Sequence, residues 1–269
     1  MAEVIANGIK IHYERTGGKK PPVVLCHGLT DSGHCWPRVV AALQADYDVI
    51  TPDARAHGLS DAPPSGYTYE DLAADVAGLI DALGLHKPAV IGHSMGGMAA
   101  ALLGAAYPTL ASRLVLEDPP FRTTATSPEG RVAQAKGWES LIARMKKGTM
   151  EQIMANQPPV GPRMTEWDES ELAPWYEAKQ QVNPLIVAIT GNTPAVWQDF
   201  IGKIACPTLL LWSEATRGAI VTEEVAELAA TLNPRIRTVH IANAGHNIRR
   251  ENFAQYIEAV KAFLSDTGI

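Results

Sequence analysis

Six consecutive residues, Gly92-His93-Ser94-Met95-Gly96-Gly97, constrain the fold of this chain more than any other feature. An apolar run, Ala89–Ile91, precedes them and an alanine-rich stretch, Met98–Tyr107, follows them, an order that predicts a strand, a tight turn and a helix. Glycine two residues either side of Ser94 suits a turn so sharp that a Cβ there would collide with the neighbouring backbone. The pattern is typical of a nucleophile elbow, which exposes a serine hydroxyl above a sheet. A glycine-rich turn with an incidental serine is the alternative, and the position between strand and helix favours the elbow.

Bulk properties narrow the class of protein. A length of 269 residues suits one α/β domain with a modest insertion. The net charge is -6 and the basic residues are scattered, which argues against binding to nucleic acid. No apolar run approaches the roughly 20 residues of a membrane span, and no signal peptide is recognised, so we expect a cytoplasmic protein that acts on a small molecule. The three cysteines, Cys26, Cys35 and Cys206, lack the spacing of metal ligands, and we expect neither metal nor cofactor.

Strand-like and helix-like segments alternate along the chain, with one long interruption. Alternating βα units predict a parallel sheet with helices on both faces. From Pro119 to about Gly191 there is no strand signal, but two helix-like stretches, Arg131–Lys147 and Glu169–Gln181, flank the proline-rich segment Gln157–Pro162. We interpret this interruption as a helical cap over the carboxyl ends of the strands, where open α/β sheets bind ligands. The expected division is a core of residues 1–118 and 192–269 and a cap of residues 119–191.

Catalysis by Ser94 needs a base nearby, because an alcohol is a poor nucleophile at neutral pH. Of the eight histidines, His246 is our choice, because it follows the last expected strand, in a loop that opens on the same edge of the sheet as the elbow. A solvated loop histidine is the alternative. The oxyanion formed on attack needs two N–H donors. We predict that the amides of Met95 and Leu29 supply them, and that His27 shapes the loop before Leu29 rather than transferring a proton.

Together these segments resemble the α/β-hydrolases of the capped esterase type. The resemblance covers nearly the whole chain apart from the cap, and it rests on four segments: His27-Gly28, Asp53 to Ser60, Gly92 to Gly97, and Ala244-Gly245-His246. It implies an α/β fold with a mostly parallel eight-stranded sheet, helices on both faces and an inserted helical cap. Ala56 is a small departure, because the family usually has glycine there.

The acid that orients His246 is the larger departure from the family. The family usually carries an aspartate shortly after the strand that here ends at Trp212, and this chain has Thr216 in that place. Some hydrolases of this fold, such as haloalkane dehalogenases, instead place the acid after the strand that precedes the cap, where this chain has Asp118. We predict Asp118, because the order Ser94, Asp118, His246 is the order this fold uses. Glu117 and Glu214 are the alternatives.

Three aromatic residues of the cap, Trp138, Trp167 and Trp175, are candidates for an apolar substrate pocket, although a cap needs such residues for its own core as well. The resemblance implies a serine hydrolase that cleaves carboxylic esters, lactones included, through an acyl-enzyme on Ser94. Hydrolysis of carbon–carbon bonds of the meta-cleavage type, cofactor-free perhydrolase or haloperoxidase activity, and a non-catalytic receptor on the same fold are the alternatives. Epoxide hydrolases and dehalogenases need an aspartate at the elbow, where this chain has serine.

Overall fold

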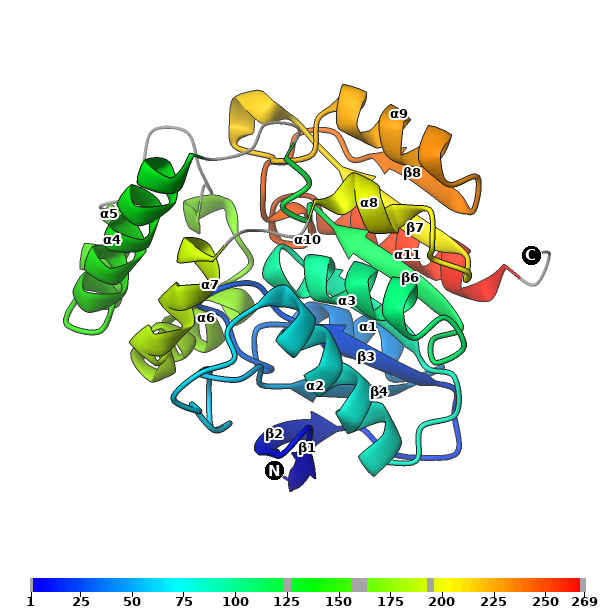
Figure 1. Cartoon of the computed structure of the whole chain (residues 1–269), viewed down its shortest axis with the longest axis horizontal. Helices are drawn as coiled ribbons and strands as arrows, with labels where there is room; N and C mark the ends of the chain where they lie inside the picture. Colours follow the sequence, from blue (N-terminus) through cyan, green and yellow to red (C-terminus); the bar gives the residue numbers. More distant parts are fainter. Residues whose placement is uncertain (1, 123–126, 156–163, 193–195, 267–269) are drawn as a thin grey trace.

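An eight-stranded sheet runs through the computed structural model, which describes residues 2–122, 127–155, 164–192 and 196–266. Its strand order is β1-β2-β4-β3-β5-β6-β7-β8 (Figure 1). The strands are β1 (Ala2–Ala6), β2 (Ile9–Arg15), β3 (Pro22–Cys26), β4 (Asp48–Pro52), β5 (Ala89–His93), β6 (Arg113–Glu117), β7 (Thr208–Trp212) and β8 (Ile236–His240). β2 pairs antiparallel with β1 and with β4, and the other neighbours pair in parallel. The expected mostly parallel eight-stranded sheet is therefore confirmed.

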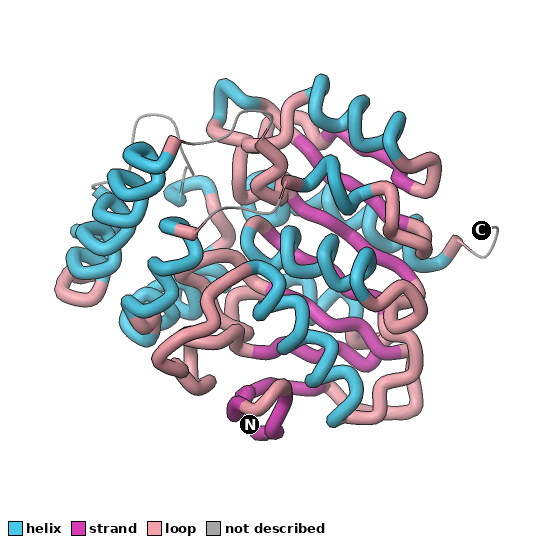
Figure 2. Tube along the Cα trace, viewed as in Figure 1, coloured by secondary structure: helices cyan, strands magenta, loops and turns pink. Residues whose placement is uncertain are grey.

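Helices cover both faces of the sheet, as Figure 2 shows. They are α1 (Pro37–Leu43), α2 (Tyr69–Ala82), α3 (Met95–Ala106), α8 (Trp197–Ile201), α9 (Glu223–Leu232), α10 (Ile248–Glu251) and α11 (Phe253–Ser265). Alternate residues of β3 divide between two hydrophobic clusters: Val24 packs with α2 and α3, whereas Val23 and Leu25 pack with α1 and α11. All three are fully buried. This burial on both faces explains why the strand reads as one continuous apolar run.

Between β6 and β7 the described residues form a group of helical segments that come before α8. They are α4 (Pro128–Met145), α5 (Met150–Ala155), η1 (Met164–Glu166), α6 (Glu169–Gln181), η2 (Pro184–Val187) and α7 (Ala188–Gly191). Figure 1 shows α4 to α7 grouped beyond one end of the sheet. The predicted helix Glu169–Gln181 coincides with α6, and α4 begins and ends a few residues before the predicted Arg131–Lys147. The proline-rich segment Gln157–Pro162 lies outside the described residues, and the limits of the cap at 119 and 191 stay a prediction.

The cap segment contacts the loops that follow two neighbouring strands. The amide of Asn183 donates to the carbonyl of Ala56, in the loop after β4, at 2.7 Å. The ammonium of Lys179 on α6 donates to the carbonyl of Thr30, in the loop after β3, at 2.9 Å. These contacts hold the helices over the carboxyl ends of the parallel strands. Within the described ranges no helix is both long and apolar enough to cross a membrane.

Candidate active site

The turn at Ser94 is strained in the way the glycine pattern predicts. Ser94 lies between β5 and α3 with φ 52° and ψ −115°, a conformation that L-residues rarely adopt. A Cβ on Gly92 would overlap the carbonyl oxygen of Gly96, and a Cβ on Gly96 would overlap that of Cys26. Only glycine therefore fits at these two positions, and the tight packing keeps the Ser94 hydroxyl at the edge of the sheet.

Three side chains from separate loops form a hydrogen-bonded chain at this edge. Nε2 of His246 lies 3.0 Å from Oγ of Ser94, and Nδ1 of His246 lies 2.5 Å from Oδ2 of Asp118. A carboxylate only accepts hydrogen bonds, so Nδ1 carries the proton and Nε2 is free to accept one from the serine. The arrangement can perform general-base-assisted nucleophilic attack.

Asp118, the residue after β6, is fully buried and held by more than His246. Its carboxylate accepts hydrogen bonds from the amide of Ile220, at 2.9 and 3.0 Å, and from that of Val221, at 2.8 Å. Both amides belong to the loop after β7, the loop in which the family usually carries its acid. In this chain that loop therefore supplies donors that stabilise the charge of Asp118 instead of the acid itself.

The other candidate acids face elsewhere. Glu214 accepts a hydrogen bond from the amide of Asn243 at 2.8 Å. Glu117 is fully buried and accepts from the amide and the guanidinium of Arg249. Thr216 is exposed. Of the three carboxylates considered from the sequence, Asp118 is the one that contacts His246.

The loop after β3 lies directly against the elbow. A Cβ on Gly28 would be 2.8 Å from Nδ1 of His93 and 3.4 Å from Cβ of Ser94, so glycine permits this approach. Among the described residues, neither the amide of Leu29 nor that of Met95 donates a hydrogen bond to another protein group. Met95 is also the first residue of α3, where helix amides face outward without intrahelical partners. Both predicted oxyanion donors are therefore available to a ligand beside Ser94.

Two buried histidines brace this loop through neutral rings. Nε2 of His27 accepts from the amide of Ala54 at 3.0 Å, and Nε2 of His57 accepts from the amide of Thr30 at 3.2 Å. Burial lowers the pKa of His57 to about 3 and also lowers the pKa of His27. Both rings thus stay unprotonated and keep their acceptor nitrogens at neutral pH, which agrees with a loop-shaping role for His27.

His93 points away from the serine that follows it. Its Nε2 lies 2.9 Å from the carbonyl oxygen of His246, and the two rings are 4.8 Å apart. Because a carbonyl only accepts, Nε2 of His93 carries the proton. Burial holds the pKa of His93 well below its usual value. His93 therefore supports the His246 loop and does not itself contact Ser94.

The structure separates the three tryptophans expected at a substrate pocket. Trp138 on α4 is half-buried and packs against the cluster that contains Met95, against which Leu29 also packs. Trp167 and Trp175 are buried in a different cluster, among methionines of the cap, with their rings in edge contact at 6.0 Å. A role in substrate binding stays a prediction for all three, and the packing favours Trp138.

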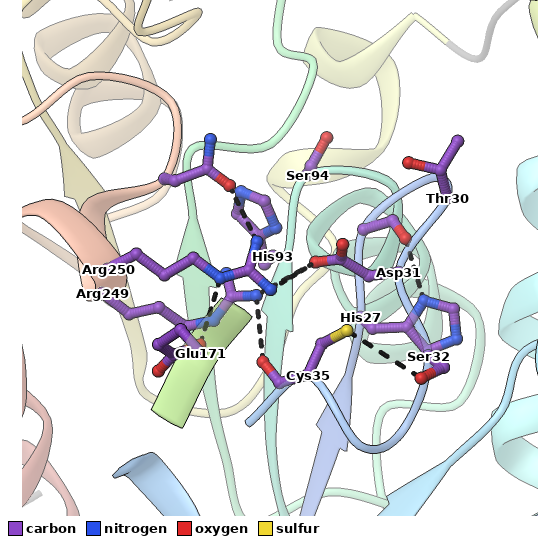
Figure 3. A network of polar contacts seen from close by, with 12 residues as sticks. His27, Thr30, Asp31, Ser32, Cys35, His93, Ser94, Glu171, Arg249 and Arg250 are labelled. Atoms are coloured by element: carbon purple, nitrogen blue, oxygen red, sulfur yellow. Dashed lines mark hydrogen bonds and ion pairs between the residues drawn. The ribbon is translucent and has the colours of Figure 1, made fainter. Parts of the chain in front are cut away.

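A buried cluster of charged side chains beside the site was not predicted from the sequence. It comprises Asp31, Glu117, Glu171, Lys179, Arg249 and Arg250. Figure 3 shows Asp31 and Glu171 facing the two arginines, with Ser94 nearby. The position of Arg249 and Arg250 just after His246 indicated that they lie near the site. No residue close to them in the sequence indicated which carboxylates they would pair with. The described ranges contain no group of histidines, cysteines and carboxylates suited to a metal ion.

Comparison with known proteins is consistent with this geometry. A family model described as alpha/beta hydrolase fold matches residues 21–157. N-formylmaleamate deformylase of Pseudomonas putida is 29% identical over 267 residues, which is 97% of this chain and 95% of the relative. A soluble epoxide hydrolase of a Corynebacterium species is 37% identical over 116 residues, only 43% of this chain and 40% of the relative. The crystal structure of an enol-lactonase from Burkholderia xenovorans superposes with a TM-score of 0.78 at 24% identity, covering 98% of this chain and 100% of that one.

Proposed function

The chain belongs to the α/β-hydrolase fold family, and from this premise we propose that it is a serine hydrolase that cleaves small carboxylic esters, lactones among them, through an acyl-enzyme on Ser94. The observation that carries the proposal is the continuous chain of contacts from Ser94 Oγ through His246 to Asp118, at 3.0 and 2.5 Å. Each contact is within the range required of a nucleophile, its base and the group that orients the base.

The proposed reaction begins with transfer of the Ser94 hydroxyl proton to Nε2 of His246 as Oγ attacks the substrate carbonyl. Asp118 stabilises the imidazolium that forms and holds its Nδ1–H. The amides of Leu29 and Met95 donate to the oxyanion, whose charge is also favoured by the N-terminus of α3. His246 then returns the proton to the leaving alkoxide, and the acyl-enzyme forms. A water molecule, deprotonated by His246, completes the cycle by the same steps and releases the acid.

Apolar surroundings of the site favour an uncharged substrate. Leu29, Trp138 and Met95 belong to or pack against one hydrophobic cluster that continues into the cap. The charged cluster nearby pairs three carboxylates with three cations, so it offers no surplus charge to an ionic substrate. The ester or lactone group itself is uncharged, so a substrate that bears no ionised substituent fits this environment.

Removal of an N-formyl group is the second candidate. The match to a deformylase over nearly the full length of both chains favours it. It would use the same three residues, and His246 would donate the proton to the departing amide nitrogen instead of to an alkoxide. Opening of an epoxide is not proposed, because the elbow carries Ser94 and the match to an epoxide hydrolase covers less than half of the chain.

Two measurements on purified protein test the proposal. A fluorophosphonate should label the wild-type protein and a Ser112→Ala control, in which an exposed serine is removed, and should not label Ser94→Ala. A panel of p-nitrophenyl esters, lactones and N-formyl amides should show turnover of the first two classes that Ser94→Ala lacks. Labelling of Ser94→Ala would refute the nucleophile, and turnover of the formyl amides alone would establish the second candidate in place of the first.

A further inference from the structure

One buried lysine of the cap reaches the turn that carries Leu29. The ammonium of Lys179 on α6 donates to the carbonyl of Thr30 at 2.9 Å and to the carboxylate of Asp31 at 2.7 Å. The Lys179 side chain is only 3% exposed. The contact therefore joins the interior of the cap directly to the loop after β3.

The turn itself is strained and needs external support. It runs from Gly28 to Asp31 and is closed by the Asp31 amide, which donates to the carbonyl of Gly28 at 3.1 Å. Within it Thr30 has φ 69°, in the left-handed region that a β-branched residue enters unfavourably. His57 accepts from the amide of Thr30, and Lys179 donates to its carbonyl. The core thus holds one side of Thr30 and the cap holds the other, so the direction of the neighbouring Leu29 amide depends on both.

Asp31 keeps two cationic contacts when Lys179 is removed, although the cluster is then left with three carboxylates and two cations. Asp31 also contacts Arg249 at 3.2 Å and Arg250 at 3.1 Å (Figure 3). Burial alone would raise the pKa of Asp31, but Arg250, Lys179 and Arg249 together hold it well below its usual range. Without Lys179 the two arginines still contact Asp31, but each also pairs with a second carboxylate, Glu117 or Glu171. A neutral substitution should therefore lower the stability of the fold as well as free the carbonyl of Thr30, so each variant is first checked for folding by circular dichroism.

We propose that Lys179 is a positioning residue for the oxyanion hole, so that docking of α6 completes the catalytic centre as well as covering it. The inference rests on the proposed serine-hydrolase function. Lys179 touches neither Ser94 nor the predicted oxyanion donors. It acts through Thr30, by fixing the turn in which the Leu29 amide is presented.

Kinetics with paired substrates test this role. Lys179→Met removes the donor and keeps the length of the side chain. Removing an oxyanion donor outright costs about 10²–10³ in kcat, so misdirecting one should lower kcat for an ester by about 10- to 100-fold with little change in KM. The thiono analogue of the same ester develops its charge on sulfur, a weak hydrogen-bond acceptor. Its rate should fall much less, so the ratio of oxo-ester to thiono-ester rates should drop about tenfold or more.

Lys146→Met is the matched control. Lys146 is also a cap lysine that donates to two carbonyls, those of Gln180 and Val182, both at 2.9 Å, but these lie within the cap. The ratio of oxo-ester to thiono-ester rates in Lys146→Met should equal that of the wild type. If Lys179→Met folds poorly, Lys179→Gln serves as the second variant. It keeps a hydrogen-bond donor, so its ratio of oxo-ester to thiono-ester rates should lie between that of Lys179→Met and that of the wild type. An unchanged ratio in a folded Lys179 variant overturns the inference.

Hydrogen exchange separates this inference from the proposed function. In Lys179→Met the peptide that covers Gly28 to Asp31 should exchange faster than in the wild type and in Lys146→Met, whether or not any ester is turned over. Faster exchange without ester hydrolysis by the wild type would refute the function and keep the coupling between cap and turn. Unchanged exchange together with active wild-type protein would refute the coupling alone.

Discussion

Replacement of Asp118 by asparagine tests the predicted acid with the smallest change in shape. Oδ1 of Asp118 accepts hydrogen bonds from the amides of Ile220 and Val221. Oδ2 accepts hydrogen bonds from Nδ1–H of His246 and, as a second acceptor, from the amide of Ile220. Asparagine has one acceptor oxygen, so it can serve the backbone amides or the histidine but not both. Turning its NH₂ toward two amide donors would leave buried donors unpaired, at about 1–3 kcal/mol each. The oxygen should therefore stay with the amides.

The side-chain NH₂ of asparagine then faces Nδ1 of His246 and donates to it. The imidazole proton moves to Nε2, where it blocks acceptance of the Ser94 proton. In the Ser-His-Asp template of serine proteases this loss of the correct tautomer costs about 10⁴ in kcat, equivalent to a barrier increase of about 5.4 kcal/mol. The backbone should tolerate the change, because Asp118 has φ 43°, a region that asparagine enters as readily as aspartate.

The assay is steady-state hydrolysis of the best p-nitrophenyl ester, with folding checked by circular dichroism. Glu214→Gln and Glu117→Gln are the controls, and both should keep kcat within about tenfold of the wild type, a barrier change near 1.4 kcal/mol. The reasoning is refuted if Asp118→Asn retains more than a tenth of the wild-type kcat. A large loss of kcat in Glu214→Gln would instead assign the acid to the loop after β7. If Asp118→Asn, Glu214→Gln and Glu117→Gln all stay active, the enzyme works with a Ser–His dyad.

The remaining predictions concern stability, the oxyanion loop and the cap. Because the folded-state pKa of His57 is about 3 and the unfolded value is about 6.5, the unfolded state binds the proton first as pH falls, and stability is lost between these two values. Glutamine at position 57 cannot titrate. The unfolding free energy of His57→Gln, measured in urea, should therefore fall by about 3 kcal/mol less between pH 7.5 and 4.5 than that of the wild type. An equal fall in the two proteins would contradict a neutral buried ring. Gly28→Ala should reduce ester turnover strongly, because its Cβ would press on His93 at 2.8 Å; wild-type kinetics would show that the loop moves freely. Trp138→Ala should reorder the preference among acyl groups, whereas Trp167→Ala should mainly lower the melting temperature, and the reverse result would place the pocket on the other side of the cap.

Local patterns predicted the elements whose shape depends on neighbours in the chain. The need for Gly92 in the elbow follows from sterics within five residues, because a Cβ there would overlap the carbonyl oxygen of Gly96, whereas the need for Gly96 comes from the carbonyl of Cys26 at the end of β3. The turn between β1 and β2 is formed by Asn7-Gly8, both with positive φ, a pair that is typical of tight hairpins. The alternation of strands and helices predicted the parallel sheet, and with it that His246 and Ser94 would share one edge. These features depend on backbone geometry and burial, which a short stretch of sequence records.

The acid, the cap contacts and the charged cluster depended on tertiary structure. Glu117 ends β6, and Asp118 and Glu214 come shortly after strands at the same edge of the sheet, so the sequence by itself could only rank the three. The positive φ of Asp118 and the amides of Ile220 and Val221 direct its carboxylate to His246, 128 positions away. Lys179 meets Thr30 across 149 positions. A side chain's partner at such separations is decided by how whole elements pack, and no neighbouring residue encodes that direction.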